Sequence, residues 1–505
     1  MGSSLTIIYL KVCNIKILDY LNKMQYYQLT KLWFAVIVSC FYISYIDGIH
    51  DRHIHYNINK WTAHDHGNTS SDITEGNCTM DMFKGDTNNN AYWACLTQLA
   101  LQRNWFPDPI NGLFSYQTWN GFDGFWQNGA VLEPMVNYMN YTNSTRYLSV
   151  IRNSWRGLES LLLGYAPYPS FDDMAWFGMS YTRIYEQLGD VDFLNTAMDI
   201  YNWTWTTGWD HTGNCSGGFY WDNTFASKQT ITNVEMLVLG ARLFRLKGGN
   251  DTVLWSRLIE TWKFIEVNNL INSSTFLIAD GIFDNNCSSN YAYKPTYNNG
   301  VLIGGLVELW RIINNDDLLE LAHKVANATM VLKSNNSILT EWCDFTGCDD
   351  DALMYKGLFV RNLRYLMDVS NSTKREFYNN WLQRNIDGIL ANNTCRKPLV
   401  DCKIVYRDGS PFNDATGPVF GTNWHGPYNF SAPMQQTGVL EIFLSATVPG
   451  VQCMGQGCSY DPPVPPAKHL TCDDKPCPPG EPCCKYNGAY TCCDTTQKCI
   501  NSVCT

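Results

Sequence analysis

A loosely repeated pattern of paired helices runs through most of this chain and limits the folds open to it. The segments "YEQLGDVDFLNTAMDI", "FRLKGGNDTVLWSRLIE" and "WRIINNDDLLELAHKVA" each contain an apolar helix end, a polar turn and the apolar start of another helix. Looser copies occur near Asn143 and Asn371. Spacings of about 45 to 65 residues are typical of two-helix units. About six such hairpins fit between Cys78 and Ala446, which favours an all-α, closed six-hairpin (α/α)6 barrel, with an open helical solenoid as the alternative.

The segments on either side of this helical region differ from it in composition. Residues 1–48 contain an apolar run of about thirteen residues after Lys31, which predicts a signal peptide or an uncleaved signal anchor, with Met24 as an alternative start. Residues 49–75 form a polar linker with five of the nine histidines, whose spacing matches no zinc-ligand template. We assign residues 76–458 to the barrel, the proline-rich residues 459–470 to a second linker, and residues 471–505 to a Cys-rich module.

Cysteines and glycosylation motifs place the chain outside the cytosol. There are 20 cysteines, and the close pairs Cys343/Cys348, Cys395/Cys402 and Cys453/Cys458 predict short disulfide loops. About fourteen N-x-S/T motifs are spread along the chain, typical of a secreted glycoprotein. The last 34 residues hold eight cysteines, and a segment this small needs disulfides because it cannot bury an apolar core. We expect an extracellular protein, at the cell surface if the N-terminal segment stays as an anchor.

Charge and aromatic content narrow the class of ligand. The formal net charge of −11 argues against nucleic acid or an anionic membrane surface as the partner. Aromatic residues make up 14% of the chain. Most of these rings belong to the core, but flat rings with a polar tip also bind neutral sugars well. Nothing in the sequence indicates a metal or an organic cofactor.

Two adjacent acidic residues, Asp172 and Asp173, follow "YPSF" at the predicted start of a strongly apolar helix. Neighbouring helical residues do not share a face, so both carboxyl groups reach one ligand only from the first turn or the preceding loop. Carboxyl groups on adjacent residues can lie ~5 Å apart, the separation of retaining glycosidases. Acidic residues also suit a helix N-terminus for purely structural reasons, so the pair alone leaves both interpretations open.

The segments around the aspartate pair favour the catalytic interpretation, because they resemble those of a known enzyme family. "SFDDMAWFGMSYTRIYEQLGD" resembles the signature of glycoside hydrolase family 76, the endo-α-1,6-mannanases, and "GFWQNGAVLE", "CSGGFYWDN", "SKQTITNVEML", "DGIFDNNC", "YNNGVLIGGLVELW" and "YKGLFVRNL" continue it in order. The resemblance implies an (α/α)6 barrel with Asp172 as nucleophile and Asp173 as acid/base. Ser216 stands where the family has the first glycine of a triple-glycine turn. The text "CPPGEPCC" resembles a granulin half-module, which is either a small binding appendage or a protease-resistant cap.

Further polar and aromatic residues in these segments are candidate sugar contacts. They are Asp280, Gln127, Asn128, Trp126, Trp176 and Trp221. Gln127 and Asn128 either hydrogen-bond sugar hydroxyls or satisfy helix ends, and the three tryptophans either stack on sugar rings or fill the core. For Lys356 and Arg361 we expect buried structural ion pairs.

The sequence therefore predicts a secreted retaining endo-α-1,6-mannosidase that acts on mannan or on mannose-containing polysaccharide by double displacement. One alternative is a cell-wall transglycosidase that uses a sugar as acceptor, although that branch usually has a lipid-anchor signal and no apolar tail closes this chain. A more distant rival is an inverting α/α-barrel enzyme. A catalytically inactive carbohydrate-binding protein and a purely structural glycoprotein are the non-enzymatic alternatives.

Overall fold

The structure is a computed structural model of the chain. It describes residues 78–106, 112–114, 124–164, 170–283, 286–396, 402–405 and 416–459, together with the backbone of short strands between residues 471 and 504. All described residues belong to the unit Asn68–Thr505. The predicted signal segment (1–48), the polar linker (49–75) and almost all of the proline-rich linker (459–470) lie outside the described residues. No helix in the described ranges combines the length and the apolar composition that crossing a membrane requires.

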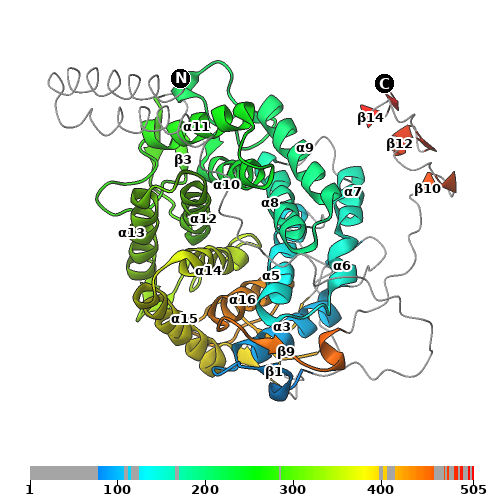
Figure 1. Cartoon of the computed structure of the whole chain (residues 1–505), viewed down its shortest axis with the longest axis vertical. Coiled ribbons are helices and arrows are strands. Elements are labelled where there is room, and N and C mark those ends of the chain that lie inside the picture. Colours follow the sequence, from blue (N-terminus) through cyan, green and yellow to red (C-terminus); the bar gives the residue numbers. More distant parts are fainter. Residues whose placement is uncertain are drawn as a thin grey trace, which may run out of the picture. The chain divides into compact units, whose positions relative to one another are not determined.

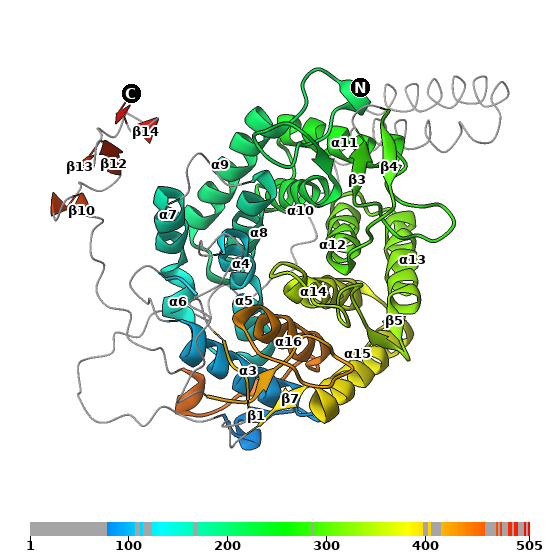
Figure 2. The ribbon, with the colours of Figure 1, turned by 180° about the vertical axis from the view of Figure 1, so that it is seen from behind.

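Two concentric rings of helices form the barrel (Figures 1 and 2). The inner ring consists of α4 (Phe125–Ala130) with α5 (Leu132–Thr142), α8 (Phe171–Leu188), α10 (Thr230–Leu246), α12 (Thr296–Ile313), α14 (Ala352–Val369) and α16 (Pro433–Ala446). The outer ring consists of α3 (Asn90–Trp105), α6 (Leu148–Arg152) with α7 (Ser154–Gly164), α9 (Val191–Gly208), α11 (Thr252–Val267), α13 (Asp316–Leu332) and α15 (Ser372–Asn392). Each inner helix packs against the next, and α16 against α5 closes the ring. The barrel is therefore confirmed, and the open solenoid is excluded.

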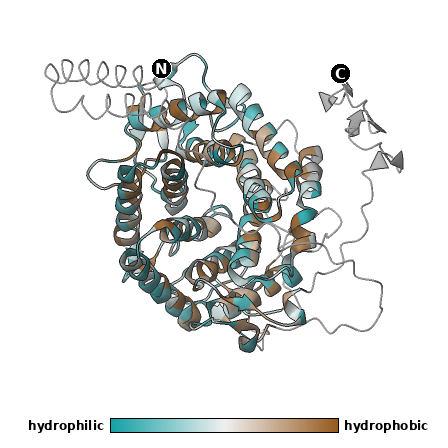
Figure 3. Cartoon of the chain, viewed as in Figure 1, coloured by the Kyte–Doolittle hydropathy of each residue, from teal (hydrophilic) through white to brown (hydrophobic). Residues whose placement is uncertain are grey.

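Burial differs between the rings because an inner helix has neighbours on nearly every side. All fourteen residues of α16 are buried, whereas seven of the twenty-one residues of α15 are. Figure 3 shows the same contrast, with hydrophilic residues concentrated on the outer helices. Glycines permit the closest inner contacts: a Cβ added to Gly357 in α14 would lie 2.5 Å from the Cα of Gly438 in α16. A side chain at Gly357 would therefore force these helices apart, whereas a Cβ on Gly438 would lie no closer than 3.6 Å to its neighbours.

A repeated side-chain contact anchors the first turn of several inner helices to the preceding loop. Asn128, Asn233 and Asn299 occupy the fourth position of α4, α10 and α12. Their Oδ1 atoms accept hydrogen bonds from the backbone N–H groups of Phe114, Phe219 and Ile278, at 2.8, 2.8 and 3.1 Å. The loops that lead to this end of the barrel are thus tied to the helices that follow them.

The barrel interior contains a network of buried charges. In α5, Glu133 accepts hydrogen bonds from Arg242 at 2.9 Å and from Arg361 at 3.1 Å, and Arg361 also donates to Glu441 at 2.6 Å. Burial opposes ionisation, but the two guanidinium groups lower the pKa of Glu133 to about 2. Lys356 pairs with the buried Asp344. The structural ion pairs expected for Lys356 and Arg361 are confirmed.

Short antiparallel strands and disulfides fasten the loops. The paired strands are β1 (Phe83–Lys84) with β9 (Gln452–Cys453), β2 (Lys228–Gln229) with β3 (Gly281–Phe283) and β4 (Ser288–Asn290), β5 (Ser334–Asn335) with β6 (Ile338–Leu339), and β7 (Thr394–Cys395) with β8 (Val419–Phe420). Three short 3-10 turns, at Met80–Met82, Asn214–Ser216 and Gln456–Cys458, complete the described elements of the barrel domain. The predicted bonds Cys343–Cys348, Cys395–Cys402 and Cys453–Cys458 are confirmed. Cys78–Cys95 and Cys215–Cys287 are additional, and the latter joins the loops before α10 and α12.

The Cys-rich C-terminal segment forms short antiparallel pairs, as expected of a small disulfide-rich module. They are β10 (Thr471–Cys472) with β11 (Lys475–Pro476), β12 (Cys483–Tyr486) with β13 (Ala489–Cys492), and β14 (Cys499–Ile500) with β15 (Val503–Cys504). Such two- to four-residue strands bury too little surface to be stable alone, which fits a segment that depends on covalent cross-links.

Candidate active site

Asp172 and Asp173 are the second and third residues of α8, so they lie at the end of the barrel where the inner helices begin. Ser170 precedes the helix in an extended conformation, and the N–H of Phe171 donates to the carbonyl of Trp221 at 2.8 Å. This contact fixes the first turn of α8 against the loop between α9 and α10. Both residues are half-buried, and Oδ1 of Asp172 is itself shielded from solvent. The predicted position in a first helical turn is therefore confirmed.

The two carboxyl groups differ in their surroundings. Oδ2 of Asp172 accepts a hydrogen bond from Nε1 of Trp221 at 3.0 Å, which favours the ionised form. Burial outweighs this bond and raises the pKa of Asp172 to about 7. Burial, followed by the charges of Asp172 and Asp351, holds the pKa of Asp173 well above its usual range. Near neutral pH the pair can therefore present one carboxylate beside one carboxylic acid.

Asp351 is a third acidic residue at this site, and we did not single it out in the sequence. It immediately precedes α14, and its Oδ1 accepts hydrogen bonds from Nε1 of Trp126 at 2.7 Å and from Nε2 of Gln127 at 2.8 Å. Burial is the main cause of its raised pKa. The sequence signal was the acidic run "CDDDAL" before "YKGLFVRNL", which by itself also fits an ordinary helix start.

Glu235, in the second turn of α10, is a fourth acidic group whose environment the sequence did not indicate. It is fully buried, and neither of its carboxyl oxygens has a hydrogen-bond partner among the described residues. Burial, followed by the charges of Asp172 and Asp173, raises its pKa well above the usual range. Burial and these neighbouring charges therefore favour the protonated form of this side chain.

Asp280 lies in the loop before α12, at the same end of the barrel. Its carboxylate accepts a hydrogen bond from Nδ2 of Asn298 at 3.1 Å, and burial raises its pKa. Next to Asn298, Tyr297 stacks on Tyr355 of α14 with ring centroids 3.9 Å apart. Burial, the neighbouring Tyr355, and the charges of Asp280 and Asp172 raise the pKa of the Tyr297 hydroxyl. Asp280, Tyr297 and Asp172 therefore lie near enough to influence one another electrostatically.

The other predicted contacts divide between the site and the core. Trp221 is 42% exposed and touches Asp172, and the half-buried Trp126 touches Asp351. Gln127 is buried and holds Asp351 in place. The amide of Asn128 is buried and bonded to backbone groups, so it satisfies a helix end. Trp176 is also buried, with its ring centroid 5.4 Å from that of Trp126, and supports that ring from behind.

The turn that departs from the family pattern retains glycine where the packing requires it. A Cβ on Gly218, whose φ is +97°, would lie 2.3 Å from the ring of Phe264, and one on Gly217 would lie 2.5 Å from Trp209. Ser216 has a φ of 66°, in the left-handed region that favours glycine. The serine therefore keeps the turn at some conformational cost, and Cys215 beside it is anchored to Cys287.

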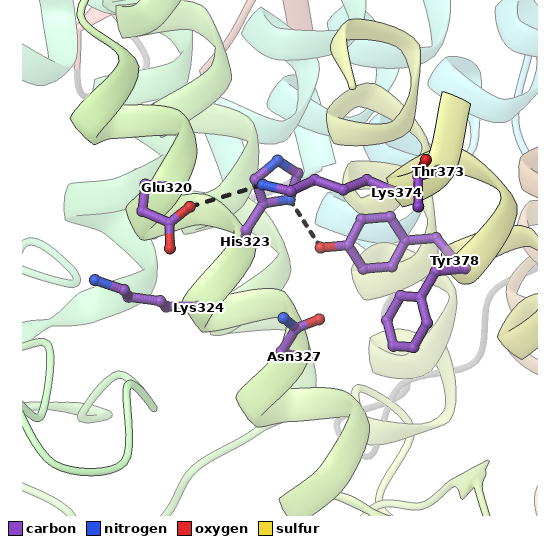
Figure 4. A pocket seen from close by; sticks show the side chains of 8 residues that line it. Glu320, His323, Lys324, Asn327, Thr373, Lys374 and Tyr378 are labelled. Atoms are coloured by element: carbon purple, nitrogen blue, oxygen red, sulfur yellow. Dashed lines mark hydrogen bonds and ion pairs between the residues drawn. The ribbon is translucent and has the colours of Figure 1, made fainter. Parts of the chain in front are cut away.

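Two other features of the described residues do not form part of this site. The cluster Cys343, Asp344 and Cys348 has the side-chain types of a metal site, but its two sulfurs are bonded to each other. A cavity between α13 and α15 (Figure 4) is lined by outer-ring side chains, including His323 and Tyr378. Nδ1 of His323 and the hydroxyl of Tyr378 are hydrogen-bonded at 2.8 Å, and burial lowers the pKa of His323 to about 4.

Comparison with known proteins identifies a family of enzymes that this sequence matches. The family model "Glycosyl hydrolase family 76" matches residues 97–452, more than half of the chain. The mannan endo-1,6-alpha-mannosidase DCW1 of Candida glabrata is 24% identical over 293 residues, which cover 54% of this chain and 64% of that protein. DCW1 of Saccharomyces cerevisiae is 23% identical over 312 residues, which cover 56% and 68%. The chain thus spans slightly less than two thirds of the first relative.

Solved structures share the barrel. The α-1,6-mannanase of Salegentibacter sp. HEL1_6 superposes with a TM-score of 0.59 at 19% identity, over 71% of this chain and 99% of that one. An inactive variant of that enzyme is in complex with α-1,6-mannotriose. Dfg5 of Chaetomium thermophilum, in complex with glucosamine, gives 0.59 at 18% identity over 72% and 91%. At these identities the likeness establishes the fold.

Proposed function

The chain belongs to glycosyl hydrolase family 76, and from that premise we propose that it is a secreted retaining endo-α-1,6-mannosidase that hydrolyses the α-1,6-mannan backbone. One observation carries the proposal: two adjacent, half-buried aspartates at the start of α8 whose surroundings favour different protonation states. The names of the curated relatives support the substrate. The five disulfides of the described residues support secretion.

The proposed reaction has two displacement steps. Ionised Asp172 attacks the anomeric carbon, the glycosidic C–O bond breaks, and Asp173 transfers its proton to the leaving oxygen. Water then attacks the anomeric carbon, Asp173 takes the proton from that water, and the bond to Asp172 breaks. The oligosaccharide is released with a new reducing end in the α configuration, and both carboxyl groups return to their starting states.

The environment of each carboxyl group suits its proposed role. The Trp221 N–H stabilises the anion of Asp172, so this residue can be ionised while Asp173 is not. Burial, followed by the charges of Asp172 and Asp351, raises the pKa of Asp173 and favours its protonated form. When Asp172 becomes esterified it loses its charge, the pKa of Asp173 falls, and Asp173 becomes a better base for the second step.

The proposal is tested with Asp172→Asn and Asp173→Asn and with the anomer released from a linear α-1,6-mannooligosaccharide. We expect Asp172→Asn to lower turnover by at least a thousandfold with unchanged folding, and proton NMR to show the α-anomer first. The chain offers a matched control, because α13 also begins with adjacent aspartates, Asp316 and Asp317, and both are exposed. Asp317→Asn should leave activity intact.

Three results would refute or redirect the proposal. Initial release of the β-anomer would remove Asp172 as the nucleophile and indicate an inverting enzyme. Early appearance of products longer than the substrate would indicate a transglycosidase, because a sugar would have replaced water as acceptor. Binding of the oligosaccharide without any cleavage would indicate a carbohydrate-binding protein.

A further inference from the structure

A series of aromatic rings leads away from the acidic residues toward the surface. Tyr297 and Tyr355 are half-buried, and their rings are stacked with an interplanar angle of 6°. The ring of Trp342 lies 6.1 Å from Tyr355, and that of Tyr293 lies 5.9 Å from Trp342 at 71°. Trp342 is 45% exposed and Tyr293 is 55% exposed. The series therefore begins next to Asn298, whose amide donates to Asp280, and ends in two accessible rings.

Trp342 is exposed although its backbone is firmly held. It lies before α14 and immediately precedes Cys343, which is bonded to Cys348. On one side of it, Glu341 is buried and accepts the backbone N–H of Thr296 at 2.9 Å. On the other side, the buried Asp344 pairs with Lys356 and also accepts the N–H of Glu341 at 3.1 Å. A rigid loop that presents a large ring to solvent has lost its conformational entropy before any ligand arrives.

A sugar ring is the ligand class that these two side chains fit. Indole and phenol rings offer a flat apolar face beside a polar atom, and the apolar face of a pyranose packs on such rings while its hydroxyls remain solvated. Because the planes of Tyr293 and Trp342 are 71° apart, one ring can stack on the face of a sugar while the other contacts its edge. The two exposed rings continue the stacked pair Tyr297 and Tyr355. This continuity indicates that the sugar they bind is part of the same polysaccharide that binds at the aspartates.

We propose that Trp342, with Tyr293 beside it, forms an outer subsite that stacks a mannose unit of the polymer beyond the units held at the aspartates. The inference rests on the proposed function and deepens it, because an outer subsite favours long substrates and internal positions along a mannan chain. Neither residue takes part in the chemical step, so their contribution is to the binding of long chains.

The test measures binding by the full secreted chain carrying Asp172→Asn, with α-1,6-mannotriose and α-1,6-mannohexaose as calorimetric probes. Adding Trp342→Ala should weaken mannohexaose binding about fivefold to tenfold and change mannotriose binding by less than twofold, because the shorter probe does not reach the outer ring. Trp342→Tyr should restore most of the affinity. Phe345→Ala is the matched control, because Phe345 lies three residues after Trp342 in the same segment before α14 and is 65% exposed.

Several outcomes would overturn the subsite. These are an equal loss for both probes, an unchanged affinity for mannohexaose, or an equal effect of Phe345→Ala. The absence of mannohexaose binding when Trp342 is intact would overturn it as well. Failure of the proposed function gives a different result. If the wild-type protein binds mannohexaose through Trp342 but does not cleave it, the outer subsite is supported and the hydrolase activity is refuted. If Trp342→Ala lowers the melting temperature, the comparison is made with Trp342→Tyr instead. A complete loss of mannohexaose binding in Trp342→Tyr would then contradict the proposal.

Discussion

The hydrogen bond from Trp221 to Asp172 gives the most direct test of how the site controls its protonation. Trp221→Phe removes one N–H donor at 3.0 Å and keeps most of the ring. A hydrogen bond to a charged group contributes roughly 1.5 to 3 kcal/mol when buried. Because Trp221 is 42% exposed, water replaces part of that interaction, and about 1 kcal/mol remains. At 1.36 kcal/mol per unit, the pKa of Asp172 should rise by about 0.7.

The assay is the pH dependence of kcat/KM on an α-1,6-mannooligosaccharide. In the proposed mechanism Asp172 must be ionised to react, so its pKa of about 7 sets the acidic limb. A raised pKa then moves that limb toward higher pH. The alkaline limb reports the loss of the proton from Asp173 while Asp172 is already ionised, so it should stay in place. Trp310→Phe is the matched control, because Trp310 also donates to a helix-start aspartate, the exposed Asp316, at 3.3 Å.

Two results would refute this reasoning. An acidic limb that stays in place or moves to lower pH would show that the Trp221 N–H does not stabilise the Asp172 anion. A shift of the alkaline limb alone would show that Asp172 is the residue that must be protonated, so the roles of the two aspartates would be reversed.

Three further predictions concern the charges and the cross-links. Asp351→Asn removes a negative charge and should lower the pKa values of both Asp172 and Asp173, so both limbs of the pH profile move to lower pH; an unchanged profile contradicts the coupling. Glu133→Gln leaves Arg242 and Arg361 without their shared anion and should cost about 3 to 5 kcal/mol in urea unfolding at pH 6. Because the folded pKa of Glu133 is about 2, below its ordinary 4.5, this stability is present above pH 4.5 and is lost as the pH falls toward 2, so the difference from wild type should shrink over that window. Replacing Cys215 and Cys287 by serine opens a 72-residue loop and should cost about 4 kcal/mol, against about 2 kcal/mol for the 5-residue loop of Cys343 and Cys348; equal costs would contradict the loop-entropy account.

The sequence alone determined the features that depend on neighbours along the chain. Hydrophobic periodicity and recurring polar turns predicted the helical hairpins, since a two-helix unit shows its pattern within about fifty residues. The same local logic placed Asp172 and Asp173 in a first helical turn and paired the cysteines that lie five or seven residues apart. Resemblance to a family then supplied the expected roles of the two aspartates.

Tertiary structure decided what surrounds those aspartates. Asp351 lies 225 residues from Trp126 in sequence and yet receives its N–H, and Trp221 lies 49 residues from Asp172. The Cys215–Cys287 bond likewise joins separate hairpins. Closing a ring of helices places the second and third residues of each inner helix at one end, whatever their separation along the chain. The pKa values there depend on burial and on charges from several helices at once, and no local pattern in the sequence encodes that sum.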